Sequence, residues 1–273
     1  MMKLRPGLIA GGAGLTMMVL LQMLPFWVAI TTAFKPITDL SPQMFFPGNV
    51  DWGNFATAIS DGNILQAVVN GVIVTGVSTA LVCTLGALTA YPLARRVTRL
   101  NKGILLFILS LLMIPPLSIM VPLYSMLTQM NGVNTYWGII VVMVTLHLPV
   151  SVFLYSSFLR NVPRALEEAA TIDGANLIQT LVRIVFPLLK PVTATVAILA
   201  GVSIWNDYSL SVFFLTDPAV RTVAPAVGAF FSQESSNLGA AAAASLIALA
   251  PVLLAYLFLQ KYFMKGMVAG AEK

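Results

Sequence analysis

Charge is scarce in this chain of 273 residues. Asp, Glu, Lys and Arg make up only 9% of the sequence, whereas 58% of the residues are hydrophobic and the mean hydropathy is +0.90. A soluble domain usually carries about 25% charged residues. Runs without any charge cover residues 6–34, 62–94, 103–159 and 235–260, and a membrane-spanning helix needs only about 20 apolar residues. The composition therefore excludes an ordinary soluble domain and predicts an integral membrane protein.

Residues that commonly carry chemistry are also few. Cys83 is the only cysteine and His147 the only histidine, so no disulfide can form within the chain, and no group of His, Cys, Asp or Glu has the spacing of a metal site. The sequence contains no G-x-x-x-x-G-K-[ST] segment, so it carries no nucleotide site of its own. We therefore predict a protein that is not an enzyme and that holds no cofactor or metal itself.

The charge-free runs predict six membrane-spanning helices. The run of 57 residues from 103 to 159 is divided by the polar turn TQMNGVNT at 128–135, and residues 191–215 add a span that only Asp207 interrupts. The predicted spans are residues 8–33, 63–94, 103–127, 136–159, 191–215 and 240–261. Pro115 and Pro116 are expected to kink the third span. The predicted fold class is all-α and polytopic.

The basic residues predict the orientation of these spans, because Lys and Arg near span ends are retained on the cytoplasmic side. With both termini in the cytoplasm, 13 of the 15 basic residues are cytoplasmic, and only Lys35 and Arg221 lie outside. This distribution accounts for the net charge of +5 and leaves no reason to expect nucleic-acid binding. The predicted location is a bacterial or archaeal cytoplasmic (inner) membrane, with several passes through the bilayer.

Two loops are predicted on the outer side, at residues 35–62 and 216–239. The first mixes Pro, Gly and aromatic residues with three aspartates, which is typical of a folded segment or a surface helix. Contact with a soluble partner and a passive loop both remain open for these segments.

The cytoplasmic loop at residues 160–190 is the most polar part of the chain. Pro163 is suited to the first turn of a helix, and Gly174 to the position after its end, so a helix of about three turns is predicted between them. Leu166, Ala169, Ala170 and Asp173 fall on one face of this helix. Glu167 and Glu168 offer charges for pairing. The helix can be read as a docking element or as a solvated helix at the membrane surface, and the composition does not choose between them.

Polar residues within the spans are candidates for a transport pathway, because they are costly in a membrane unless they face a cavity or another helix. Trp205, Asn206 and Asp207 are predicted in the outer half of the fifth span, where an aromatic face and polar groups suit a sugar. His147 is a second candidate, about midway along the fourth span. A structural role between helices is the alternative for all four residues.

One segment of the loop resembles a known family. Glu168, Ala169 and Ala170, then Asp173, Gly174 and Ala175, and finally Ile184, Phe186 and Pro187 are similar to the EAA loop of the inner-membrane permeases of binding-protein-dependent ABC importers. Phe186 stands where that pattern most often has Leu. The resemblance implies that the segment from Glu168 to Gly174 is a coupling helix that enters a cleft of an ATPase subunit. The residues expected to couple to that ATPase are Glu167, Glu168, Ala169, Ala170, Asp173, Gly174 and Ala175.

Other segments resemble the carbohydrate branch of that family, the maltose-type permease with six spans. They include MIPPLSIMVPLYSML at 113–127, WNDYSLSVFFL at 205–215 and KYFMKGMVAGAEK at 261–273. The resemblance implies a type I ABC importer permease fold, with residues 1–273 forming a single transmembrane domain. It also implies several partners, namely a second permease subunit in a heterodimer, two cytoplasmic ATPase subunits that bind ATP and Mg, and an extracytoplasmic sugar-binding protein.

Other functions remain as alternatives. A permease for glycerol-phosphate or a polyol is disfavoured, because no Lys or Arg lies inside the six spans to meet a phosphate, Lys261 standing at the very end of the last one. An ion-coupled carrier that acts alone usually has several ionisable groups within its spans, and here Asp207 and His147 are the only ones. A membrane scaffold without a transport role is the third alternative.

Overall fold

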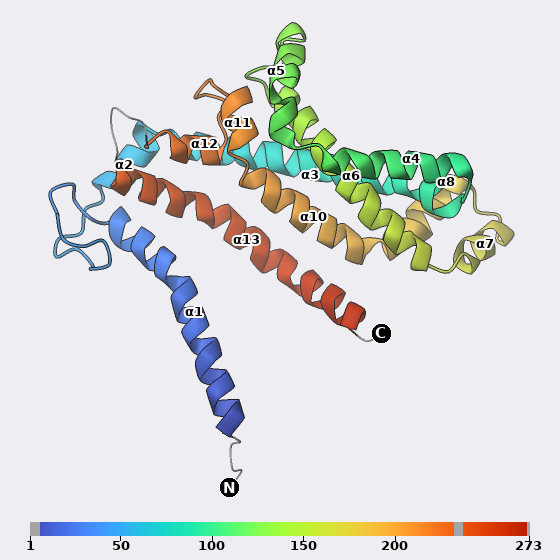
Figure 1. The fold of residues 1–273 in the computed structure, drawn as a ribbon, viewed down its shortest axis with the longest axis horizontal. Helices are drawn as coiled ribbons and strands as arrows, with labels where there is room; N and C mark the ends of the chain where they lie inside the picture. Colours follow the sequence, from blue (N-terminus) through green and yellow to red (C-terminus); the bar gives the residue numbers. More distant parts are fainter. Residues whose placement is uncertain (1–5, 232–236, 272–273) are drawn as a thin grey trace. The chain divides into compact units, whose positions relative to one another are not determined.

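The computed structural model describes residues 6–231 and 237–271, and this part of the chain is helical throughout, with turns and loops between the helices (Figure 1). The chain divides into two compact units. The first unit comprises residues 1–65 and 226–250, and the second comprises residues 66–225 and 251–273. The predicted all-α class is confirmed.

The first unit contains α1 (Pro6–Ala33), the short α2 (Gly53–Ser60) and the start of α13 (Leu238–Ala271). The segment between α1 and α2 has a fixed turn. Lys35 Nζ donates hydrogen bonds to the carbonyl oxygens of Ser41 and Pro42, at 2.8 and 2.7 Å, and to Ser41 Oγ at 2.7 Å. Asn54 of α2 is buried and donates to the carbonyl oxygen of Lys35 at 2.7 Å. The predicted outer segment is therefore folded and includes a helix.

The second unit contains further long apolar helices, the longest of them with 32 residues. Its main helices are α3 (Ile64–Arg95), α4 (Arg99–Ser110), α5 (Met120–Gln129), α6 (Tyr136–Asn161) and α10 (Lys190–Trp205), with the short α11 (Ser209–Phe214) and α12 (Val223–Gly228) following. In the described part of the chain, four helices are long and apolar enough to span a membrane, and the number is up to six if each of two bent helix pairs forms one span. The six predicted spans correspond to these four helices and two pairs.

The third predicted span is sharply bent at the prolines. The stretch Arg99–Met113 meets the stretch Pro116–Gln129 at an angle of 92°. Ile114 and Pro115 have extended backbone between them, because the residue before a proline avoids the helical conformation and proline itself cannot donate a backbone hydrogen bond. The predicted kink at Pro115 and Pro116 is confirmed, and it separates two helices.

The fifth predicted span, residues 191–215, is wrong at its C-terminal end. Helix α10 ends at Trp205, and a new short helix, α11, begins at Ser209. Asp207 Oδ2 accepts a hydrogen bond from the backbone nitrogen of Ser211 at 2.8 Å. Asn and Asp side chains compete with the helical hydrogen-bond pattern and favour helix ends. Asn206 and Asp207 therefore lie between two helices and not within one.

Helices α3 and α6 pack closely at Gly86. Ser151 of α6 is buried, and its Oγ donates a hydrogen bond to the carbonyl oxygen of Val82 at 3.0 Å. A Cβ atom added at Gly86 would lie 1.9 Å from Ser151 Oγ and 2.9 Å from Ser151 Cβ. Glycine at this position lets the two backbones approach, as small residues do where helices pack in membranes.

Replacing Gly86 with alanine is expected to lower the free energy of unfolding by about 1–3 kcal/mol, the usual cost of overpacking a core. The measurement is the melting temperature of the purified chain in detergent. Gly76→Ala is the matched control, because it lies on the same helix and an added Cβ there meets no atom within 4 Å. The control should be neutral or stabilising, since alanine is the better helix former. Equal melting temperatures for the two variants would contradict the close packing at Gly86.

Candidate functional site

The helix predicted in residues 160–190 is α7, Ala165–Ile172. It is shorter than the predicted three turns, since it has eight residues and begins after Pro163. It ends as expected at Gly174, whose φ of +82° is the left-handed conformation that glycine adopts most easily. The backbone nitrogens of Gly174 and Ala175 donate to the carbonyl oxygens of Thr171 and Ala170, at 3.1 and 2.9 Å. This pair of bonds is a Schellman motif. The chain then turns at Asn176, which forms a capping box with Gln179, into α8 (Leu177–Thr180).

The face predicted for partner contact is divided by the structure. Ala170 is buried against its own chain, while Leu166, Ala169 and Asp173 are exposed and Ala175 is half-buried. Glu168 is exposed, and its carboxylate has no hydrogen-bond or ion-pair partner among the described residues. The surface that α7 leaves open to another protein therefore includes Leu166, Glu168, Ala169 and Asp173. Ala170 attaches the helix to the fold.

Glu167 points the other way, toward the end of α3. Both of its carboxylate oxygens are used: Oε1 accepts a hydrogen bond from Arg95 Nε at 2.7 Å, and Oε2 accepts one from the hydroxyl of Tyr91 at 2.8 Å. Arg95 Nη2 also lies 2.5 Å from Oε1. The sequence indicated two charges for pairing with a partner, and the structure gives one of them a partner within the chain.

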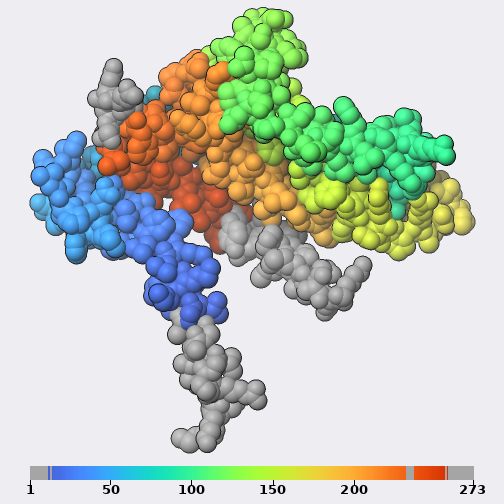
Figure 2. Space-filling model, viewed as in Figure 1, coloured from blue at the N-terminus to red at the C-terminus, as the bar shows by residue number. Residues whose placement is uncertain are grey.

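An exposed apolar group lies beside the turn at Gly174 and was missed in the sequence. Ile172 is 86% exposed, Ile178 71% and Leu177 60%. These residues belong to the segment coloured yellow in Figures 1 and 2. The sequence does contain a signal for them, because branched apolar residues stand on both sides of the polar end of the helix. A loop that only faces solvent would carry polar residues there. Together with Glu168, they form a surface with an acidic and an apolar part.

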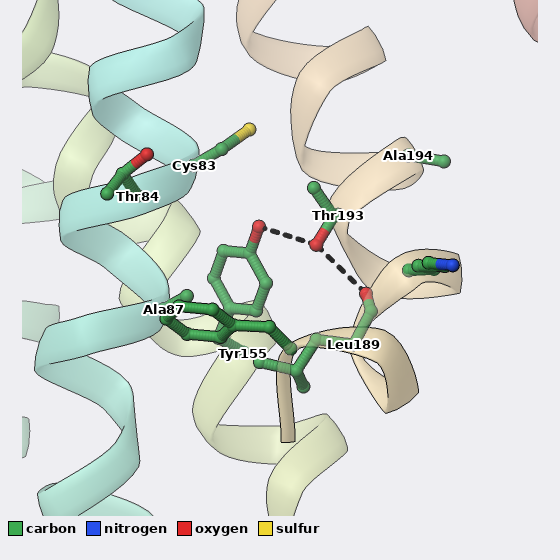
Figure 3. Close-up of a pocket in the computed structure, with 9 residues that line it drawn as sticks. Cys83, Thr84, Ala87, Tyr155, Leu189, Thr193 and Ala194 are labelled. Carbon is green, nitrogen blue, oxygen red and sulfur yellow. Dashed lines mark hydrogen bonds between the residues drawn. The ribbon is translucent and has the colours of Figure 1, made fainter. Parts of the chain in front are cut away.

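The chain beyond α8 leads into α10 through irregular helix. Residues Leu181–Val185 form a π-helix, α9 (Phe186–Leu188) follows, and the stretch Leu177–Leu188 meets Lys190–Trp205 at an angle of 71°. A cavity of about 450 Å³ lies beside this bend, between α3, α6 and α10. In Figure 3, the hydroxyl of Tyr155 is directed at Thr193, to which it donates at 3.0 Å, and Thr193 Oγ1 donates to the carbonyl oxygen of Leu189 at 2.9 Å.

A second cavity, of about 680 Å³, contains two of the predicted pathway residues. Trp205 and Asn206 lie in its lining, together with residues of α3, α10 and the second-unit part of α13. The lining is mainly apolar, and Thr75, Thr79 and Asn206 contribute its oxygen and nitrogen groups. The indole of Trp205 packs beside Gly71 of α3, where an added Cβ would lie 3.2 Å from the ring.

The other two predicted pathway residues have partners elsewhere. Asp207 holds the start of α11 through Ser211, as described above. His147 Nε2 lies 3.0 Å from Ser203 Oγ of α10, and its Nδ1 lies 2.8 Å from the carbonyl oxygen of Met143. These contacts suit a link between α6 and α10. The structure thus brings Trp205 and Asn206 together at a cavity and gives Asp207 and His147 structural contacts.

Residues 83–268 match the family described as binding-protein-dependent transport system inner membrane component. The chain belongs to this family. The matched region includes α7, the bend before α10 and most of the lining of both cavities. Membership also explains why no nucleotide-binding segment occurs in the sequence, because the family is the membrane component of a transport system.

Relatives of this family member extend over nearly its whole length. It is 43% identical over 253 residues to the melibiose/raffinose/stachyose import permease protein MelC of Bacillus subtilis, with 92% of each chain covered. It is 30% identical to the multiple sugar-binding transport system permease protein MsmG of Streptococcus mutans, with 95% of each chain covered. A crystal structure of a bacterial ABC transporter involved in the import of alginate has the same fold, with a TM-score of 0.76 at 19% identity, covering 93% of this chain and 95% of that one.

Proposed function

We propose that this chain is a permease subunit of an ATP-driven importer for a sugar or oligosaccharide, and that it forms half of the translocation pathway as a single transmembrane domain. The observation that carries the proposal is α7, a short helix that presents the free carboxylate of Glu168 beside exposed apolar residues. A soluble ATPase subunit is the partner suited to such a surface in the cytoplasm. The predicted residues Glu168, Ala169, Asp173 and Gly174 are proposed to form this contact.

The remaining partners follow from the transport cycle. A second permease subunit would complete the pathway, two ATPase subunits would bind ATP and Mg, and an extracytoplasmic binding protein would deliver the sugar. Both termini are proposed to lie in the cytoplasm, as the distribution of basic residues indicates. Closure of the ATPase pair on ATP would move α7 and turn the pathway outward. To shift such an equilibrium from 1:99 to 99:1 requires about 5.5 kcal/mol of differential binding.

The chemistry of the 680 Å³ cavity supports a neutral sugar. Trp205 supplies an aromatic face and Asn206 an amide, and no charged residue belongs to the lining among the described residues. A glycerol-phosphate would need a cation that this lining lacks. Because the relative that is 43% identical is a melibiose/raffinose/stachyose import permease, these three sugars are the first proposed substrates.

Cells that express this chain with its partner subunits are expected to accumulate radiolabelled melibiose, raffinose or stachyose, and deletion of the chain should abolish that uptake. A matched strain that lacks only the ATPase subunit should take up none, because the chain has no nucleotide site of its own. The measurement is sugar retained by the cells over time. Uptake by vesicles that contain this chain without an ATPase would contradict the proposal and favour an ion-coupled carrier.

A further inference from the structure

Arg95 connects three helices at one end of the second unit. It is the last residue of α3, and its Nη1 donates hydrogen bonds to the carbonyl oxygens of Leu159 and Val162, at 2.7 and 3.0 Å, where α6 ends. Its Nε and Nη2 bind Glu167 of α7, as described above. Arg164, which precedes α7, donates in return to the carbonyl oxygen of Arg95 at 2.8 Å. One guanidinium therefore fixes α7 to the ends of both α3 and α6.

The pair formed by Arg95 and Glu167 is largely removed from solvent. The side chain of Arg95 is 9% exposed and that of Glu167 is 15% exposed. Salt and water screen such a pair much less than an exposed one. Tyr91, one turn earlier on α3, adds a hydrogen bond to the same carboxylate. The contact between α7 and α3 is therefore short, charged and geometrically defined.

The two adjacent glutamates of α7 face opposite sides. Glu168 is exposed and free to meet another protein, while Glu167 is bound to α3. Glu167 and Glu168 are neighbours on a helix of only two turns. A partner that displaces Glu168 therefore displaces Glu167 as well, because no flexible segment separates the two residues. The helix thus has one surface for an external partner and one charged attachment to a span.

The backbone that connects α7 to α10 is irregular, in contrast to the ion pair that connects α7 to α3. It passes through the Schellman turn at Gly174, the π-helix Leu181–Val185 and the 71° bend at Leu189 before α10 begins. π-Helical segments often mark functional sites in helices. The 450 Å³ cavity beside the bend leaves space next to Leu189 and Thr193 (Figure 3). When α7 moves, the backbone between α7 and α10 can change conformation, so that α10 need not move with it. The ion pair between Glu167 and Arg95, by contrast, keeps α7 and α3 at a fixed distance.

We propose that the Arg95–Glu167 pair is the connection through which α7 moves α3 during the transport cycle, so that Arg95 and Glu167 act as positioning residues. This inference rests on the proposed function of α7 as the contact with an ATPase. Helix α3 extends over 32 residues, about 48 Å at 1.5 Å per residue. In the half of α3 that lies away from Arg95, Val72, Thr75 and Thr79 line the 680 Å³ cavity that contains Trp205. Displacement of α3 at Arg95 is thus linked to the shape of that cavity.

The test uses the whole complex, purified and reconstituted into lipid vesicles, with raffinose as the transported probe. Glu167→Gln removes the charge and keeps the size of the side chain. The complex with this variant is expected to retain its ATPase subunits and to hydrolyse ATP, but to transport about tenfold less raffinose per ATP, within the usual range of coupling between sites. Arg95→Gln should lower the ratio at least as much, because it also removes the hydrogen bonds to the end of α6. The double variant should be no worse than Arg95→Gln alone, because both single variants remove the interaction between Arg95 and Glu167.

Two further variants separate this role from a structural one. Arg95→Lys keeps the positive charge and should restore part of the raffinose-to-ATP ratio. Arg96→Gln is the matched control, since Arg96 is adjacent and exposed, and its side chain has no hydrogen-bond or ion-pair partner among the described residues. This variant should leave the ratio unchanged. If Arg95→Gln fails to assemble, Glu167→Gln decides the question, because it leaves the bonds of Arg95 to α6 in place.

The outcomes are distinguishable from a failure of the proposed function. If the wild-type complex transports none of the three proposed sugars and hydrolyses no ATP, the function is wrong. If the wild-type complex transports raffinose and Glu167→Gln has the same raffinose-to-ATP ratio, the proposed function stands and the Arg95–Glu167 connection is wrong. Loss of ATPase binding by Glu167→Gln would also overturn it, since the residue would then act at the partner surface.

Discussion

Replacing Glu168 with alanine, or Gly174 with aspartate, is expected to abolish most sugar uptake while the chain is still inserted in the membrane. Truncating one member of a buried charged contact costs about 2–5 kcal/mol, because the other charge is left unpaired in the interface. Aspartate at position 174 would have to adopt a φ of +82°, which costs an ordinary residue about 1–2 kcal/mol. It would also distort the turn between Glu168 and the exposed apolar residues.

The measurements are raffinose uptake by cells and the amount of ATPase subunit that co-purifies with the chain in mild detergent. Gly48→Asp is the matched control for Gly174→Asp, because Gly48 lies in an exposed loop outside the predicted spans, has no positive φ, and an added Cβ there meets nothing within 4 Å. The control should transport normally. Wild-type uptake by both Glu168→Ala and Gly174→Asp would show that α7 is not the coupling element.

The shape of α7 could be predicted because its signals are local. Pro163 near its start and Gly174 after its end depend only on backbone conformation within a few residues, and the structure confirms the end of the helix at Gly174. The inward direction of Glu167 could not be predicted. Its partner, Arg95, is 72 residues earlier in the chain, and no periodicity within the loop distinguishes Glu167 from Glu168.

The membrane spans, too, could be predicted only where the signal is local in the sequence. Charge-free runs located α1, α3 and α6 within a few residues, because a stretch of about 20 apolar residues is a strong signal by itself. Helix α13 extends past the predicted end at residue 261 to Ala271. The charge-free runs did not show that helix α10 ends at Trp205. A single aspartate in an apolar stretch can face a cavity within a span, or it can end the helix by binding a backbone nitrogen, and the sequence does not distinguish the two. The structure gives Asp207 the nitrogen of Ser211. The size of the bend at Pro115 also depends on packing, which composition does not describe.

Cysteines placed at Ile172 and at Leu40 are expected to react from opposite sides of the membrane. Both positions are highly exposed, at 86% and 94%, so the side on which a reagent is applied decides whether it reacts. The background is Cys83→Ala, which removes the only native thiol. With a thiol reagent that cannot cross the cytoplasmic membrane, position 40 should be labelled in intact cells. Position 172 should be labelled only after that membrane is opened.

This difference follows from the orientation predicted by the basic residues, because a surface that meets a cytoplasmic ATPase is useful only if residues 160–190 face the cytoplasm. An ATPase subunit bound to α7 would shield position 172 from the reagent, so the chain is also labelled in cells that lack the ATPase. There, opened membranes should give full labelling at position 172 and sealed cells none. Labelling of position 172 in sealed cells would reverse the orientation and, with it, both the ATPase contact proposed at Glu168 and the movement of α3 proposed for the Arg95–Glu167 pair.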